Sequence, residues 1–362
     1  MGPRRGKMAK RPSKKVGSQT KSELTMDQLL TKTQELMDDN NYELALQTAV
    51  KAIELDENNT RALLLASIIQ LESGDIEPAL NCLLRCVEIS PDRGFEKYMY
   101  LGQFTVELQS VKYYQLGINA IQLDLSDVAK DSEHALVLRR KMAEAYVAMT
   151  EIYLTDCCFE SDAESKCEEF LRLGSEADPQ CPEVYQTMAS VRLSQNQPEN
   201  ARECITKSMS LWANKDQNDP TQIPSYENRL ALVRLLLELD DKDGALNIME
   251  RLQKEDDESV DLWYLYGWTY YLQGEEADAN GGDKAEVFAS ARECFKQAIK
   301  LATLQEFEND GLVDHARELV TVISSALPST NGDNLEEDAA EAQELDWENI
   351  SSGDDDDVEM SV

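Results

Sequence analysis

Histidine and cysteine are the side chains that most often carry acid–base, nucleophilic or metal chemistry, and this sequence uses them sparingly. Its two histidines, His134 and His315, have no cysteine, serine or second histidine at a catalytic spacing. Cys82 and Cys86 stand four residues apart, and no second pair completes the ligand set of a zinc site. A glycine-rich phosphate loop is also missing. We therefore expect a non-enzyme with no cofactor and no metal, in which cysteines fill small core positions.

Acidic side chains dominate the composition instead. The 362 residues include 70 Asp and Glu against 35 Lys and Arg, which gives a net charge of −35. Such a chain repels other polyanions, so we expect it not to bind nucleic acid directly. The same repulsion acts between copies of the chain and favours a monomer.

The remaining composition favours a helical protein with a large core. Hydrophobic residues make up 42% of the chain, and the 16 glycines and 10 prolines are few for this length. No apolar run reaches the roughly 18 residues that cross a bilayer, so we expect no membrane segment. No apolar core of a signal peptide follows the basic N-terminus, so we expect an intracellular protein with reduced cysteines.

Charge divides the sequence into three predicted parts. Residues 1–24 form a basic tail with eight Lys and Arg, residues 25–328 form the folded body, and residues 329–362 form a tail with thirteen acids and no base. Both tails lack apolar periodicity and are predicted to be disordered. The basic tail fits either a nuclear import signal or a solubilising segment. The acidic tail fits either a mimic of nucleic acid that holds a basic partner or a solvated tail.

A period of 34 residues runs through the body, so that the segment starting at Tyr42 aligns with the one starting at Ile76. The clearest copy begins at Val260 and reads Trp263-x-x-Tyr266-Gly267-x-x-Tyr270, then Ala291-x-x-x-Phe295-x-x-Ala298. This pattern resembles the tetratricopeptide repeat, a pair of helices that approach closely because small residues occupy repeat positions 8 and 20.

Seven copies of the repeat fit over about residues 26–302. The third and fourth copies are predicted to carry insertions between their helices, and the seventh to carry one from Glu275 to about Val287. A last amphipathic helix over about residues 311–327 is predicted to cap the final repeat. The resemblance implies an all-α, right-handed superhelical tetratricopeptide-repeat solenoid of about seven repeats plus a C-terminal capping helix.

By the same resemblance, positions 2, 5, 9, 12 and 13 of each first helix face a concave groove. Position 2 is acidic in six of the seven repeats, at Asp27, Glu96, Glu144, Glu183, Glu227 and Asp261. Positions 9 and 13 add Glu72, Glu107, Glu151 and Glu238. Acids in the first turn also stabilise a helix without any ligand, which explains position 2 equally well. They are unfavourable near a helix C-terminus, so position 13 favours an acidic groove for a basic partner.

Aromatic side chains occupy the groove positions of the last repeat, at Tyr264, Trp268 and Tyr271. An acidic groove with an aromatic end suits an extended, Lys- and Arg-rich peptide, which would bind through ion pairs, bidentate arginine contacts and cation–π stacking. The alternative is that these rings belong to the helical core.

The basic head, acidic tail, seven repeats and closing motif Leu345-Asp-Trp347-Glu-Asn-Ile350 together resemble the fungal assembly chaperones dedicated to ribosomal large-subunit protein number four. The resemblance implies that this newly made ribosomal protein is the partner, with its long basic internal loop in the concave groove. It also implies that the chaperone keeps the protein soluble and escorts it to the nucleus, which places the chain in cytoplasm and nucleus.

Two other functions compete with this hypothesis. A co-chaperone that clamps the acidic C-terminus of a heat-shock protein needs several basic residues on the inner wall, which offers mainly Arg61 and Arg234. A scaffold subunit of a multiprotein complex is the alternative that the sequence excludes least well.

Overall fold

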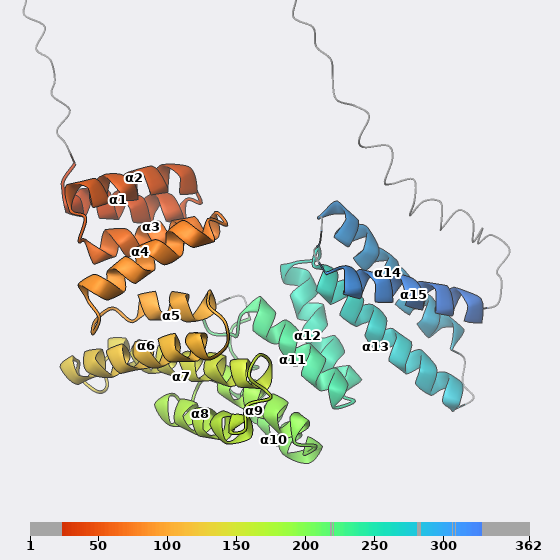
Figure 1. Cartoon of the computed structure of the whole chain (residues 1–362). Helices are drawn as coiled ribbons and strands as arrows, with labels where there is room; N and C mark the ends of the chain where they lie inside the picture. The colour runs from red at the N-terminus through yellow and green to blue at the C-terminus, as the bar shows by residue number, and fades with distance from the viewer. Residues whose placement is uncertain are drawn as a thin grey trace, which may run out of the picture. The chain divides into compact units, whose positions relative to one another are not determined.

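The computed structural model describes residues 24–217, 219, 221–280, 284–305, 307 and 309–327, and every regular element in these ranges is a helix (Figure 1). In chain order the helices are α1 (Met26–Asp38), α2 (Tyr42–Leu55), α3 (Thr60–Glu72), α4 (Ile76–Ile89), α5 (Glu96–Gln103), α6 (Glu107–Asp127), α7 (Glu133–Leu154), α8 (Ala163–Ala177), α9 (Pro182–Ser194), α10 (Pro198–Ser210), α11 (Tyr226–Glu238), α12 (Lys242–Glu255), α13 (Val260–Ala279), α14 (Ala285–Leu304) and α15 (Asp310–Ala326).

The chain forms two compact units, which we call unit 1 and unit 2 and describe separately. The boundary lies between Val191 and Arg192, within α9. The predicted tails, apart from Leu24, lie outside the described residues. None of the helices in the described part of the chain is long and apolar enough to cross a membrane.

Local sequence signals fix where the first helix of each repeat begins and ends. The Thr25 hydroxyl accepts a hydrogen bond from the backbone N–H of Gln28, whose side chain accepts one from the N–H of Thr25, which forms a capping box at α1. Four first helices end two residues before a left-handed residue that turns the chain into the second helix. These residues are Asn40, Gly74, Asn196 and Asp240.

The close approach of the two helices in a repeat is confirmed at the predicted small positions. In the seventh repeat, a Cβ added to Gly267 would lie 2.7 Å from the ring of Phe295, and Ala291 is fully buried. In the third repeat, a Cβ on Gly102 would lie 2.7 Å from the ring of Tyr114. An aromatic ring therefore lies against a bare backbone in both repeats, which only glycine permits.

The predicted insertion in the third repeat is wrong. Only residues 104–106 separate α5 from α6, and the Ser110 hydroxyl donates a hydrogen bond to the carbonyl of Gly102. Ser110 therefore takes the small position opposite Gly102, for which the sequence analysis offers no residue this early in the helix. The first helix of this repeat is shortened, and the second extends to Asp127. The insertion in the fourth repeat is confirmed, because residues 155–162 connect α7 to α8.

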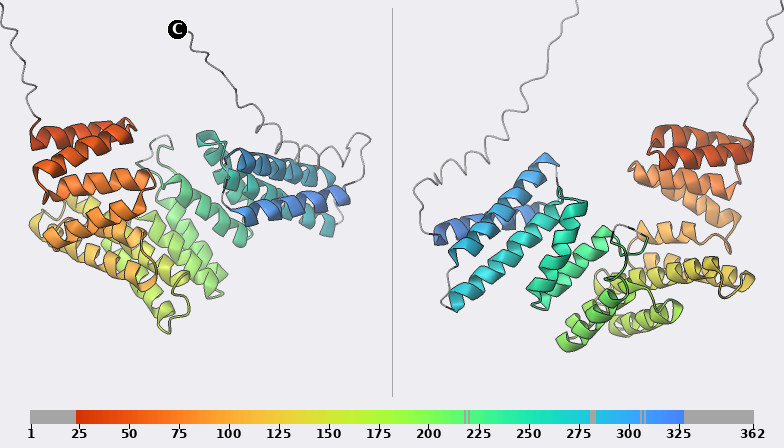
Figure 2. Two further views of the ribbon diagram at one scale, coloured as in Figure 1. Left: turned by 45° about the horizontal axis from the view of Figure 1, so that its top comes forward. Right: turned by 180° about the vertical axis from the view of Figure 1, so that it is seen from behind.

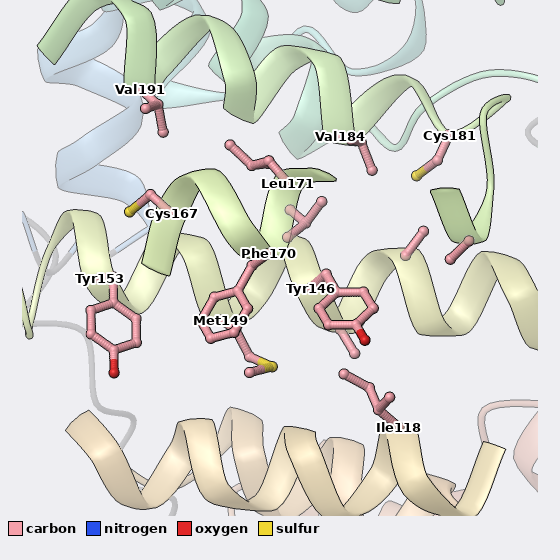
Figure 3. Close-up of a cluster of buried hydrophobic side chains, with 14 of the residues drawn as sticks. Ile118, Tyr146, Met149, Tyr153, Cys167, Phe170, Leu171, Cys181, Val184 and Val191 are labelled. Atoms are coloured by element: carbon pink, nitrogen blue, oxygen red, sulfur yellow. The ribbon is translucent and has the colours of Figure 1, made fainter. Parts of the chain in front are cut away.

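An apolar cluster of unit 1 lies between α6, α7, α8 and α9 (Figure 3). The ring of Phe170 on α8 lies 6.2 Å from that of Tyr146 and 5.9 Å from that of Tyr153, both on α7. One turn farther along α8, a Cβ added to Gly174 would lie 3.3 Å from Val184 of α9 and 3.4 Å from Tyr146 of α7. Successive helix pairs thus share one continuous core, as expected when repeats stack.

In unit 2, α15 covers the last repeat as predicted. Helices α13, α14 and α15 lie side by side (Figure 2). Ala316, Leu319 and Ile323 of α15 are buried against Phe288 and Phe295 of α14. The insertion predicted from Glu275 to about Val287 mostly lengthens the two helices, because α13 continues to Ala279 and α14 begins at Ala285. Residues 281–283 lie outside the described part of the chain.

Candidate functional site

Three neighbouring first helices of unit 1 bring charged groups together around Tyr100 on α5. Burial raises the pKa of the Tyr100 hydroxyl, and the charge of Glu72 on α3 adds to the rise. Lys141 on α7 lowers this pKa, and Glu96 on α5 raises it. Glu72 and Glu96 come from different repeats, so the structure unites two of the predicted carboxylates on one surface.

Glu151 on α7 is another predicted carboxylate of unit 1. Its side chain is exposed to solvent, yet desolvation by the surrounding protein raises the pKa of its carboxyl. Burial, together with the charge of Glu151, raises the pKa of the Tyr114 hydroxyl on α6 to about 12. The carboxylate is thus accessible to a ligand although nearby protein atoms reduce its hydration.

Most of the ten predicted carboxylates make no hydrogen bond or ion pair through their side chains within the described ranges. These unpaired residues are Asp27, Glu72, Glu96, Glu107, Glu151, Glu227 and Glu238. Glu144 pairs with Lys141 at 2.7 Å and Asp261 pairs with Arg234 at 2.6 Å. Glu183 accepts a hydrogen bond from the thiol of Cys181 at 3.2 Å.

Helix boundaries change the interpretation of two of these acids. Glu107 was expected near the C-terminus of a first helix, but it is the first residue of α6, with a φ of 54°. A carboxylate there stabilises the helix dipole and needs no ligand. Glu144 was expected in a first turn, but α7 begins at Glu133 and Glu144 lies in its interior. The helix dipole therefore does not account for Glu144.

Unit 2 contains the other predicted residues. Arg234 on α11 bridges to Asp261 on α13, and it also lowers the pKa of Tyr264, which burial raises. Glu227 is exposed in the first turn of α11, and Glu238 is exposed at its end. The structure thus gathers Arg234, Asp261 and Tyr264 between the first helices of two repeats.

The three predicted aromatic residues, Tyr264, Trp268 and Tyr271, are half-buried, and each takes part in packing the core. The Tyr264 hydroxyl lies 2.7 Å from Nδ1 of His315 on α15, and its ring meets Phe295 edge-on at 5.7 Å. Trp268 stacks on Tyr271 with ring centroids 5.7 Å apart and an interplanar angle of 18°. Each ring packs against the core on one side and keeps part of its surface accessible.

Five of the eight cysteines are buried, Cys82 and Cys204 are partly buried, and Cys158 is exposed. Cys86 is buried, its thiol donates to the carbonyl of Thr60 at 3.4 Å, and burial raises its pKa to about 11. Burial likewise raises the pKa of Cys167 and of Cys294 to about 11, so these thiols stay protonated at neutral pH. Within the described ranges, no three His, Cys, Asp or Glu side chains are grouped as metal ligands.

Sequence reasoning missed Tyr100, Tyr114 and His315 as members of these surfaces. Tyr100 stands at none of the expected groove positions, and Tyr114 belongs to a second helix whose register was set by Gly117 and Ile121. His315 was considered only for catalysis, whereas it binds Tyr264 across two helices. The signal that remained unused was the aromatic content of α5 and α6, which is Tyr98, Tyr100, Tyr113 and Tyr114.

Known proteins are similar to this chain both in single repeats and over almost its whole length. Models of the tetratricopeptide repeat match residues 60–93 and 230–279. A probable assembly chaperone of rpl4 from Emericella nidulans is 32% identical, over 99% of this chain and 98% of its own length. The protein of the same description from Schizosaccharomyces pombe is 28% identical, over 90% of this chain and 96% of its own.

A solved structure shows the same fold. It is titled as residues 1–338 of an assembly chaperone of RpL4, is 32% identical, and covers 72% of this chain and 100% of its own with a TM-score of 0.64. With the repeat models and the helix pairs described above, this likeness confirms an all-helical tetratricopeptide-repeat solenoid.

Proposed function

This chain belongs to the family of rpl4 assembly chaperones, and from that premise we propose that it binds newly made ribosomal large-subunit protein number four and holds it for assembly. The premise rests on a relative that matches almost end to end. The proposed action is that of a stoichiometric binding protein and not of an enzyme.

The observation that carries the proposal is the set of unpaired carboxylates on the first helices. Like charges without counter-ions repel each other, and this repulsion costs folding free energy that a basic ligand would recover. The set spans three repeats of unit 1 at Asp27, Glu72 and Glu96, with Glu151 in the fourth. An extended basic segment, such as the internal loop of a ribosomal protein, would lie along these first helices and pair with them in turn.

The proposed benefit to the partner follows from the same charges. A free ribosomal protein is basic and binds RNA indiscriminately, and carboxylates that cover its RNA-binding surface keep it soluble until ribosomal RNA displaces them. We include in the proposal that the chain, as a monomer, escorts its partner from cytoplasm to nucleus. The heat-shock clamp loses support, because Arg234 is already paired with Asp261.

Co-expression with ribosomal protein number four tests the function directly. We expect the ribosomal protein to be soluble and to co-purify in equimolar amount with this chain, but to precipitate or bind RNA when expressed alone. An equally insoluble ribosomal protein in the presence of the chain would contradict the proposal. Mass spectrometry of proteins bound to the chain in cells should recover mainly this one basic protein, whereas a scaffold would recover a set of large partners.

A further inference from the structure

Helix α15 occupies the place of a further first helix. It packs directly on α14, the second helix of the last repeat, as α3 packs on α2 and α13 on α12. When Asp310 is counted as position 1, the groove positions 5 and 9 are Asp314 and Glu318, which are both exposed and acidic. Asp314 pairs with Arg317 at 3.0 Å, so Glu318 is the carboxylate that α15 leaves available to a ligand. A helix that only capped the last repeat would need its buried apolar stripe but no carboxylates on this exposed face.

His315 fixes how α15 meets the aromatic residues of α13. Its ring nitrogen lies 2.7 Å from the hydroxyl of Tyr264, and its ring lies 5.7 Å from that of Trp268. Trp268 stacks in turn on Tyr271, and all four side chains stay partly accessible. These residues form one surface, which we call the aromatic shelf: Tyr264, Trp268, Tyr271 and His315.

Two carboxylates lie one helical turn from residues that meet or belong to the aromatic shelf. Glu318 follows His315 by three residues, so it lies on the same face of α15, one turn farther along. Glu238 follows Arg234 by four residues on α11, and Arg234 is the residue that reaches Asp261 and Tyr264. Among the described residues, neither Glu318 nor Glu238 has a hydrogen-bond or ion-pair partner. The charge of Glu275 also acts on the hydroxyl of the half-buried Tyr271.

From this geometry we propose that α15 extends the binding wall, by which we mean the surface formed by the first helices of successive repeats. The aromatic shelf, together with Glu238 and Glu318, is then a subsite for an arginine side chain of the basic partner. The inference rests on the proposed function and adds which kind of basic side chain of the partner is recognised at this end of the wall. A guanidinium plane would stack on the indole of Trp268, and its N–H groups would donate to the carboxylates of Glu238 and Glu318.

Arginine suits this subsite better than lysine for a physical reason. The guanidinium is planar, weakly hydrated and able to stack while donating hydrogen bonds at its edge. The lysine ammonium is a compact, strongly hydrated charge that gains from the carboxylates but loses more on leaving water to meet an aromatic face. The carboxylates therefore attract either cation, and the stacked rings distinguish between them.

Two matched peptides test the subsite on the full chain. Both are fluorescently labelled dodecapeptides with glycine at alternate positions, and the other six residues are all arginine or all lysine. We expect the wild-type chain to bind the arginine peptide about 2- to 5-fold more tightly, the range set by cation–π stacking at an accessible site. Trp268→Leu should abolish the preference, and Trp268→Tyr should retain part of it. Glu318→Gln should weaken both peptides alike, whereas Glu286→Gln, an exposed acid on α14, should change neither.

The outcomes separate the subsite from the wider function. Equal affinity for the two peptides in the wild-type chain, or a preference that survives in Trp268→Leu, would overturn the subsite while leaving an acidic wall that binds basic segments. Failure of both peptides to bind would remove the proposed function and the subsite with it. If Trp268→Leu does not fold, Trp268→Tyr and Glu318→Gln decide: an unchanged preference in the first and unchanged affinities in the second would refute the subsite.

Discussion

At the scale of single residues, the packing of each helix pair depends on residues that have a small side chain or none. Gly102 and Gly267 allow Tyr114 and Phe295 to lie against helix backbone, and Ala291 is fully buried at the facing position. These sites leave no room for another methyl group. The repeat register therefore makes a direct prediction about packing.

Ala291→Leu should destabilise unit 2 by about 1–3 kcal/mol, because the larger side chain overpacks the contact between α13 and α14. Thermal unfolding followed by circular dichroism measures the effect. Ser290→Leu makes a comparable change one residue earlier, on the exposed face of α14, and should stay within about 0.5 kcal/mol of wild type. Equal melting of the two variants would show that the register is wrong.

Glu151 is the residue at which stability and binding should conflict. Desolvation raises its pKa in the folded chain, so the ionised form destabilises the fold at a pH above that raised value. The cost fades as the pH falls toward the ordinary glutamate value of 4.5, where the carboxyl becomes protonated in both states. Glu151→Gln should therefore raise the melting temperature at neutral pH, by an amount that shrinks in acid, and should weaken binding of the basic partner.

A matched control for this change is Glu144→Gln, seven residues away on α7. Its carboxylate is paired with Lys141, so we expect no rise in melting temperature. If Glu151→Gln melted like wild type and bound the partner equally well, Glu151 would be an ordinary surface residue. Melting curves at several pH values and a binding titration at neutral pH provide both measurements.

At the scale of helices, the departures from a regular repeat place the charges. Because α7 begins ten residues before the predicted start of the fourth repeat, Lys141 reaches Tyr100 and pairs with Glu144. Because α5 is short, Glu107 moves to the start of α6, which removes it from the C-terminal end of a first helix. Binding of the partner to unit 1 is therefore best tested at acids that the structure keeps on first helices.

The triple variant Glu72→Lys, Glu96→Lys and Glu151→Lys should stay folded but lose the basic partner. The first two carboxylates are unpaired on α3 and α5, and Glu151 is exposed and unpaired on α7. Exposed ion pairs contribute only about 0–1 kcal/mol each to folding, whereas a like charge beside a bound cation costs several kcal/mol. Melting temperature and partner affinity are measured on the same preparation.

The control for this variant places three lysines on second helices, at Glu43, Glu77 and Glu164. These acids lie in the first turns of α2, α4 and α8. We expect their reversal to lower stability by about 0.3–1 kcal/mol per site through the helix dipole and to leave much of the affinity intact. Equal loss of affinity in both variants would mean that net charge, and not the wall, attracts the partner.

At the scale of the whole molecule, the charge of −35 makes association sensitive to salt. The affinity for ribosomal protein number four should fall steeply between 0.1 M and 1 M salt, because the screening length shrinks from about 10 Å to about 3 Å. A chain ending at residue 328 should keep this dependence if the wall binds the partner. An affinity that is flat across this range would show that apolar contacts dominate, and a complete loss on truncation would assign binding to the acidic tail.

The sequence by itself determined the helix pairs, their close-packed positions and the sign of the charge that the first helices carry. These features are local, because small residues, caps and left-handed turn residues act within one or two turns of helix. For this reason α1 and α3 begin and end 34 residues apart, and α11 and α13 begin 34 residues apart.

Tertiary structure alone decided the register of α6, the surroundings of Glu144 and the partial burial of the aromatic shelf. Ser110 and Gly117 are both small, stand about two helical turns apart and both face α5: the Ser110 hydroxyl bonds to the carbonyl of Gly102, and a Cβ added to Gly117 would overlap the side chain of Met99. Only the folded structure shows that Ser110 is the one opposite Gly102. Tyr264 and Trp268 meet His315 from about fifty residues away, and no short-range pattern encodes that contact. What a sequence repeat predicts is the face of a helix, and what the fold adds is the neighbour that the face meets.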